Sequence, residues 1–289
     1  MTTNEPEASD HSLRDHYCSL LQRALTRYEM ETETSYTPIH AVNAHHALRP
    51  LIEAGQKILR KRSLDFVRVQ PPDAKIRVEG KDWPRSAETM VGMKRLNNLR
   101  ECLVQVFADR IPGDILEAGV WRGGASIFMR GVLLAYGETH RRSWVADSFA
   151  GLPEPEPGRY PPDQDSVFHA FDELTVSLEM VKANFAKYDL LDDSVHFLKG
   201  WFEETLPAAP IDQLALLRLD GDMYSSTMQT LDALYDKVAV GGFVVVDDYG
   251  GIPPCKQATD DFRQRRGIED PIVTVDWTGV YWRKSGAIS

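Results

Sequence analysis

Carboxylates are concentrated in two short segments of this chain, each directly after an apolar run. Asp220 and Asp222 follow one run, and Asp247 and Asp248 follow the next. Both runs are typical of buried parallel strands, whose carboxyl ends meet at one ligand-binding edge of an open α/β sheet. Because neighbouring carboxylates repel one another, a bound cation is the simplest way to hold them together. Ligands that are all oxygens favour Mg²⁺ or a similarly hard ion over zinc.

Asp220, Asp247 and Asp248 are the predicted metal ligands. The second and third lie 27 and 28 residues after the first, which is one strand–helix–strand unit and places them at adjacent strand ends. A helix-capping role would account for one of these aspartates but poorly for a whole cluster. Asp222 is open to three interpretations: a further ligand, a helix cap or a general base. His169, shortly after a long loop, is the other candidate base.

A glycine-rich turn after the apolar run 115–118 predicts a second ligand-binding feature. The turn reads Glu117-Ala-Gly-Val-Trp-Arg-Gly-Gly124. Gly119 allows a tight turn, and Gly123 lets the backbone approach a ligand at a helix N-terminus. Glu117 stands where dinucleotide-binding enzymes have their first glycine, which disfavours a hydride-transferring dehydrogenase. The E-x-G-x-x-x-G pattern is instead that of S-adenosylmethionine methyltransferases, in which Glu117 suits the ligand's ammonium group; a plain strand–helix turn is the alternative.

The next predicted strand ends at Asp147, 23 residues after Gly124. Folds of this kind place an acid there to bind ribose hydroxyls, and Ser148 adds a hydroxyl group; an exposed loop aspartate is the alternative. Gly200 and Trp201 follow a later strand and could border an adenine ring. Packing in the core is an equally good interpretation of Trp201.

Strands and helices alternate from residue 114 onward, which is typical of an α/β fold. The predicted strands are 115–118, 144–147, 195–198, 214–219, 242–246 and a terminal pair, 272–275 and 279–283; the predicted helices are 125–136, 174–188, 226–237 and 254–266. The segment 148–165 contains five prolines and no apolar periodicity. We expect it to be a loop that closes over the site as a lid.

The N-terminal part of the chain is less informative. Residues 1–11 read as a disordered tail, 16–30 and 46–62 as helices, and 63–81 as a linker. A long helix is predicted to follow, with Ser86 as its N-cap.

Composition excludes several classes of protein. The 289 residues carry a net charge of −10 with no strongly basic face, so nucleic acid is not an expected substrate. No apolar stretch approaches the roughly 20 residues of a membrane span, and no apolar signal region is present at the start. The three cysteines have neither metal-site nor disulfide spacing. We therefore expect a cytoplasmic protein that does not bind membranes.

These motifs together resemble the macrocin O-methyltransferase family. The resemblance runs from about Trp83 to Arg283 and rests on the carboxylate clusters, the glycine-rich turn and three further segments: Thr89-Met-Val-Gly-Met-Lys-Arg-Leu96, Val145-Ala-Asp-Ser-Phe-Ala-Gly-Leu-Pro153 and Gly200-Trp-Phe-Glu-Glu-Thr-Leu-Pro207. It implies a doubly wound, Rossmann-like class I methyltransferase sheet with a helical N-terminal segment. Residues 83–289 would form the S-adenosylmethionine-dependent domain, and residues 1–82 would lie on the acceptor or oligomer side.

The resemblance also implies the chemistry and its participants. Members of this family use S-adenosylmethionine and Mg²⁺ to methylate sugar hydroxyls of macrolide and aminocoumarin antibiotics, so the partner would be a glycosylated small molecule, with a homo-oligomer as an open option. The metal would be held by Asp220, Asp247 and Asp248, and the base would be Asp222 or His169. The implied cofactor-binding residues are Met90, Glu117, Gly119, Arg122, Gly123, Asp147, Ser148, Gly200 and Trp201.

Two alternatives remain open at this point. A catechol-like O-methyltransferase acting on a small phenol or diol shares the metal site, but such enzymes use a lysine three residues after the first metal aspartate, and Met223 stands there. A catalytically silent binding protein that keeps the cofactor pocket is the second alternative. The intact set of carboxylates argues against it.

Overall fold

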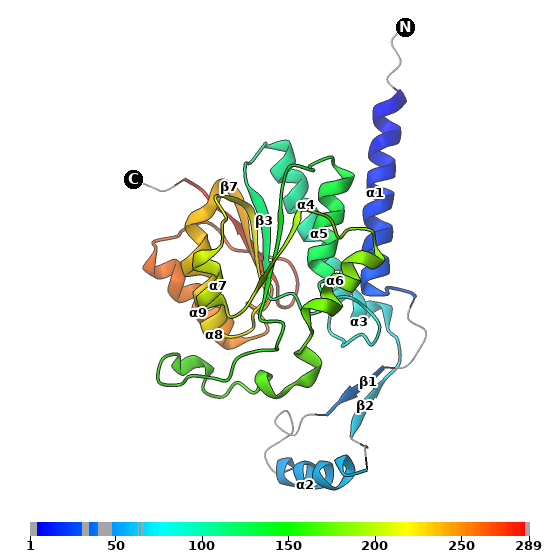
Figure 1. Cartoon of the computed structure of the whole chain (residues 1–289), viewed down its shortest axis with the longest axis vertical. Helices are drawn as coiled ribbons and strands as arrows, with labels where there is room; N and C mark the ends of the chain where they lie inside the picture. The colour runs from blue at the N-terminus through cyan, green and yellow to red at the C-terminus, as the bar shows by residue number, and fades with distance from the viewer. Residues whose placement is uncertain (1–4, 31–34, 40–47, 63, 65, 287–289) are drawn as a thin grey trace.

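A mixed sheet of seven strands forms the centre of the molecule (Figure 1). The computed structural model describes residues 5–30, 35–39, 48–62, 64 and 66–286. The strand order is β5-β4-β3-β6-β7-β9-β8, with bounds β3 (Asp114–Ala118), β4 (Ser143–Asp147), β5 (Val195–Lys199), β6 (Leu214–Leu219), β7 (Val238–Val246), β8 (Val273–Thr274) and β9 (Val280–Arg283). Strands β3 to β7 are parallel, whereas β9 runs antiparallel to β7 and β8. The predicted doubly wound sheet with a terminal hairpin is confirmed.

Helices cover both faces of the sheet, which explains why its central strands are apolar throughout. One face packs against α4 (Met93–Ala108), α5 (Gly124–Ala135) and α6 (Leu178–Lys187), with α1 (Glu5–Thr26) lying against α5, and the other against α7 (Phe202–Ala208), α8 (Tyr224–Leu234) and α9 (Pro253–Arg265) (Figure 1). Leu99 and Phe128 are fully buried in the first layer, and Leu217 and Leu231 in the second. No described helix combines the length and the apolar composition that crossing a membrane requires.

The direction of chain winding reverses between β3 and β6. From β3 the chain moves outward to β4 and β5, then returns to the other side of β3 to form β6 and β7. In open α/β sheets, the crevice at such a reversal, beyond the carboxyl ends of the strands, is where ligands bind. The topology therefore brings the glycine-rich turn after β3 next to the carboxylates after β6.

A smaller structure lies below the main sheet in Figure 1. It consists of α2 (Arg49–Arg60) and an antiparallel pair, β1 (Ser35–Pro38) and β2 (Val67–Gln70). A short helix, α3 (Ala74–Glu79), then leads back to the main body. The prediction of a linker over 63–81 was wrong, because both β2 and α3 lie in that range.

The helix predicted to begin near Ser86 begins seven residues later, at Met93, and its N-cap is Gly92. The preceding segment is instead bonded to two other helices: the backbone N–H of Glu88 donates to Leu25 (3.0 Å), and its carbonyl accepts from Gly124 (2.9 Å). These contacts hold the segment extended, although its apolar spacing is that of a helix. The Ser86 cap was therefore a wrong prediction.

Other boundaries also differ from expectation. Residues 5–11 belong to α1 rather than to a disordered tail, while residues 1–4 lie outside the described residues. Helix α1 ends at Thr26, and α2 begins at Arg49; the predicted start at His46 lies outside the described residues. Helix α7 was not predicted at all, because its seven residues are too few to show a clear period.

Gly119 gives a direct test of how closely the turn after β3 approaches the turn after β6. Its φ is +87°, and a Cβ added there would lie 1.9 Å from the carbonyl oxygen of Asp220. We expect Gly119→Ala to lower the free energy of unfolding in urea by more than about 2 kcal/mol, through strain and a backbone clash. Gly137→Ala is the matched control, because φ is +74° there and nothing lies within 4 Å of the added atom. Equal losses in the two variants would contradict the close approach.

Candidate active site

A cavity of about 560 Å³ opens at the carboxyl edge of the sheet. Its walls come from the ends of β3, β4, β5, β6 and β7, from the segment before α4, and from the loop after β4. Of the predicted site residues, those that line it are Met90, Glu117, Gly119, Asp147, Ser148, Gly200, Trp201, Asp220, Asp222, Asp247 and Asp248. These predicted residues therefore meet at one cavity, at the edge of the sheet that the sequence indicated.

Three of the predicted residues are not among those that line the cavity. His169 is exposed on a short 3₁₀ helix (Phe168–Ala170). Arg122 points its guanidinium at the carbonyl oxygens of Arg85 (3.0 Å) and Ala87 (2.9 Å), so it holds the segment before α4 in place. At Gly123, an added Cβ would lie 2.8 Å from the side chain of Val181, which indicates a packing role against α6.

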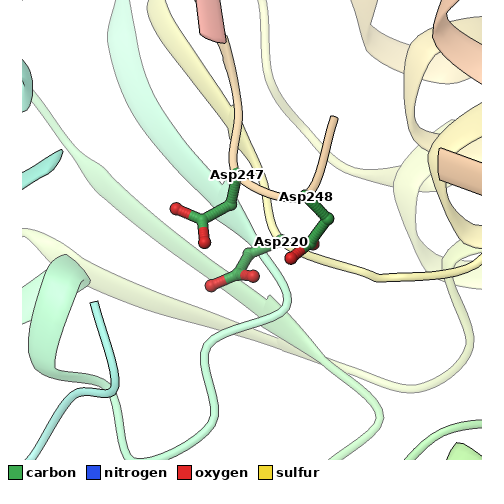
Figure 2. A group of neighbouring side chains, drawn as sticks. All are labelled: Asp220, Asp247 and Asp248. Carbon is green, nitrogen blue, oxygen red and sulfur yellow. The ribbon is translucent and has the colours of Figure 1, made fainter. Parts of the chain in front are cut away.

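The predicted metal ligands do converge (Figure 2). Asp220 follows β6, and Asp247 and Asp248 follow β7. Each offers a carboxylate oxygen, and the three oxygens lie within 4.8 Å of one another. An all-oxygen set of this size suits a hard divalent cation such as Mg²⁺.

Two buried arginines hold this cluster together. Arg218, on β6, is fully buried and donates to Glu117, Asp220 (2.8 Å) and Asp247. Arg95, on α4, donates to the other oxygen of Asp247 and, through Nε, to Asp276 (3.0 Å). Unpaired buried charges would strongly destabilise the fold, so these bonds fix the carboxylates in position.

Negative charge exceeds positive charge at the site. Around the two buried guanidiniums of Arg95 and Arg218 lie the carboxylates of Glu117, Asp220, Asp247 and Asp276, which pair with them, and those of Asp222 and Asp248, which line the same part of the cavity. Burial and its neighbours Asp220 and Asp247 raise the pKa of Asp222 to about 8. Burial, followed by repulsion from Asp222, raises the pKa of Asp248 well above its usual range. A divalent cation among these oxygens would offset the repulsion.

The half of the cavity that the sequence predicts for the cofactor is built from the turns after β3, β4 and β5. The carboxylate of Asp147 accepts from the backbone N–H groups of Val120 (2.8 Å) and Phe149 (2.7 Å), which holds it beside the glycine-rich turn. The backbone N–H of Gly200 donates to the carbonyl of Asp147 (3.0 Å) and so brings Trp201, which is 38% exposed, to the same side.

The carboxylate of Glu117 is bound by other residues of the protein, whereas we expected it to face the ammonium group of a ligand. Its side chain is 1% exposed, and it accepts hydrogen bonds from Arg218 and from the hydroxyl of Ser126. Burial raises its pKa to about 7, although Arg218 and Ser126 act in the opposite direction. Glu117 therefore links the glycine-rich turn after β3 to the carboxylate cluster through Arg218.

The loop after β4 is closed on itself near its start and attached to the body near its end. The hydroxyl of Ser148 donates to the carbonyl of Gly151 (2.6 Å), which forms a turn within the loop. Farther along, the fully buried Asp163 accepts from the backbone N–H groups of Tyr224 (2.7 Å) and Ser225 (2.9 Å), at the N-terminus of α8. The expected lid movement, which stays a prediction, would therefore involve the part of the loop before Asp163.

Sequence reasoning missed the residues that support the site. Arg218 offered a signal, because it is the single charge in the apolar run Leu-Ala-Leu-Leu-Arg-Leu. Arg95, Asp163 and Asp276 offered none, since each reaches the site only through the tertiary fold.

Comparisons with known proteins agree with this geometry. A sequence model described as macrocin-O-methyltransferase (TylF) matches residues 14–284. The 8-demethyl-8-(2,3-dimethoxy-alpha-L-rhamnosyl)-tetracenomycin-C 4'-O-methyltransferase of Streptomyces olivaceus is 53% identical over 223 residues, which are 77% of this chain and 85% of that protein. The demethyldecarbamoylnovobiocin O-methyltransferase of Streptomyces niveus is 52% identical over 211 residues, 73% of this chain and 80% of that protein.

Among solved structures, the O-methyltransferase NovP superposes with a TM-score of 0.80 at 42% identity, covering 94% of this chain and all of that one (100%). Its fold is that of the Rossmann-like class I methyltransferases, which together with the family implies S-adenosylmethionine as the methyl donor. The chain is a methyltransferase and belongs to the macrocin O-methyltransferase family.

Proposed function

We propose that this protein transfers a methyl group from S-adenosylmethionine to a sugar hydroxyl of a glycosylated natural product, in a reaction that depends on Mg²⁺. The observation that carries the proposal is the cluster of Asp220, Asp247 and Asp248 beside the cofactor half of the same cavity. By their names, one relative methylates a rhamnosyl-tetracenomycin C and the other demethyldecarbamoylnovobiocin.

The residues present fit both groups. S-adenosylmethionine would lie along Gly119, Asp147 and Trp201, with Asp147 toward the ribose hydroxyls. Mg²⁺ would be held by Asp220, Asp247 and Asp248, with Arg218 and Arg95 fixing the orientation of Asp247. When bound, the cofactor supplies an activated methyl group, and the metal orients the acceptor and makes its hydroxyl more acidic.

The chain itself has to remove the proton of the acceptor hydroxyl. Asp222 lines the cavity next to the metal cluster, on the rigid turn between β6 and α8. His169 is exposed and does not line the cavity. Because a general base must reach the proton that it accepts, we assign this role to Asp222.

The position of the lysine in catechol-like enzymes is informative here. Met223 occupies it and is 1% exposed. A buried thioether cannot accept the proton, so the turn after β6 leaves Asp222 as the group with suitable chemistry.

Removal of the metal gives the first test of the proposed function. We expect EDTA to abolish methylation of demethyldecarbamoylnovobiocin and Mg²⁺ to restore it in the wild-type protein. Asp248→Asn should lose that rescue and keep its fold. Asp248 is the better site for substitution, since Asp247 pairs with two buried arginines and its loss would destabilise the protein by about 3–5 kcal/mol. Full activity in metal-free buffer would contradict the proposal.

The choice of base can be tested with two variants. Asp222→Asn should lower kcat by about 10²–10⁴-fold, the usual contribution of a general base, with Mg²⁺ and acceptor binding little changed. His169→Ala is the control and should keep a kcat close to that of the wild type. An inactive His169→Ala variant alongside an active Asp222→Asn variant would reverse the assignment.

Cofactor binding should not require the metal. We expect S-adenosylmethionine to bind in EDTA, and Asp147→Ala to weaken that binding in calorimetric titrations, because Asp147 shapes the cofactor turn. Asp165→Ala, an exposed aspartate of the neighbouring loop, serves as the control. Equal affinities in the wild type and in Asp147→Ala would remove Asp147 from the cofactor site.

A further inference from the structure

Trp277 is a large aromatic side chain in the cavity wall to which the reaction described above assigns no role. It lies in the connection between β8 and β9 and is 45% exposed, yet it lines the cavity. Tryptophan provides a wide and rigid contact surface, so an indole left open in a ligand cavity is available for packing.

The indole ring is held in place by the protein. Its Nε1–H donates to the carbonyl of Glu79 (2.8 Å). On its other side the ring lies close to Gly251. A Cβ added at Gly251 would be only 3.0 Å from ring atom Cζ3, so the absence of a side chain there leaves space for the ring. The ammonium of Lys81 lies 5.6 Å from the ring centroid. The ring is therefore preorganised, which reduces the entropic cost of packing against a ligand.

The strand order fixes the side of the metal cluster on which Trp277 lies. Apart from Met90, the predicted cofactor residues lie at or just after the ends of β3, β4 and β5, and the metal cluster follows β6 and β7. Next in the sheet comes β9, where Val280 pairs with Val246 at the end of β7. Trp277 lies just before this point, so the metal cluster stands between it and the cofactor half.

Local bonds join the Trp277 connection to the metal cluster. The hydroxyl of Thr278 donates to the carbonyl of Asp247 (3.0 Å). Asp276 is paired with Arg95, which also binds the carboxylate of Asp247. The position of Trp277 relative to the metal cluster is thus set by residues on both sides of it.

Methyl transfer requires the attacking oxygen and the sulfur of the donor on opposite sides of the methyl group. With the cofactor over β3 to β5, the acceptor has to lie over β7 and β9, where Trp277 is. We propose that Trp277 is the platform for the acceptor, with its indole face packed against the apolar C–H face of the sugar ring that is methylated. This inference rests on the proposed function and adds to it a residue that selects a ring-shaped, uncharged acceptor surface.

Two substitutions and a matched control test the platform. Acceptors would be demethyldecarbamoylnovobiocin and 8-demethyl-8-(2,3-dimethoxy-alpha-L-rhamnosyl)-tetracenomycin C, the compounds in the names of the two relatives. We expect Trp277→Ala to raise the acceptor KM about tenfold with kcat little changed, the pattern for loss of ground-state binding. Trp277→Phe keeps an aromatic face and should recover most of this loss. Val273→Ala, on β8 and away from the cavity, should match the wild type.

Calorimetry separates a platform from a merely structural role. S-adenosylhomocysteine and Mg²⁺ should bind to Trp277→Ala as tightly as to the wild type. An unchanged acceptor KM in Trp277→Ala, or a parallel loss of cofactor affinity, would overturn the inference and leave the proposed function standing. A wild-type protein that methylates neither glycoside in the presence of Mg²⁺ would overturn the proposed function, and the platform with it.

Discussion

The site depends on one buried cation, the guanidinium of Arg218 in the middle of the sheet. It bonds to Glu117 near the end of β3, Asp220 after β6 and Asp247 after β7, and so ties together three neighbouring strand ends. A charge with 1% exposure is tolerated only because each partner carries the opposite charge. The same bonds that satisfy the arginine therefore fix the geometry of the carboxylates.

Two arginines do not balance the carboxylates that meet there. Asp222 and Asp248 make no ion pair among the described residues, and both have raised pKa values because burial and their acidic neighbours disfavour the charged form. Without a ligand, such carboxyl groups relieve their repulsion by taking up protons, whereas a divalent cation would let them stay charged. This is the physical argument for a divalent cation, and it is independent of the family to which the chain belongs.

The sequence predicted those parts of the fold and site that are local. Apolar runs identified the parallel strands, and the carboxylates after two of them were placed correctly because strand ends in such a sheet coincide. The spacing of residues could not show that Arg122 holds the segment before α4 in place, or that Gly123 packs against α6. It also could not show that the segment before α4 is extended. The hydrogen bonds of Glu88 to the carbonyl of Leu25 and from the N–H of Gly124 override the helical pattern of that segment. His169 was adjacent to the loop in sequence, but the fold leaves it exposed outside the cavity wall.

We infer that Asp220, Asp247 and Asp248 hold a metal ion. A crystal grown with Mn²⁺ in place of Mg²⁺, with S-adenosylhomocysteine present, would locate the ion by its anomalous scattering. We expect a peak within coordination distance of a carboxylate oxygen from each of the three aspartates. A fully occupied cofactor site with no peak between them, or with the ion bound elsewhere, would contradict this inference.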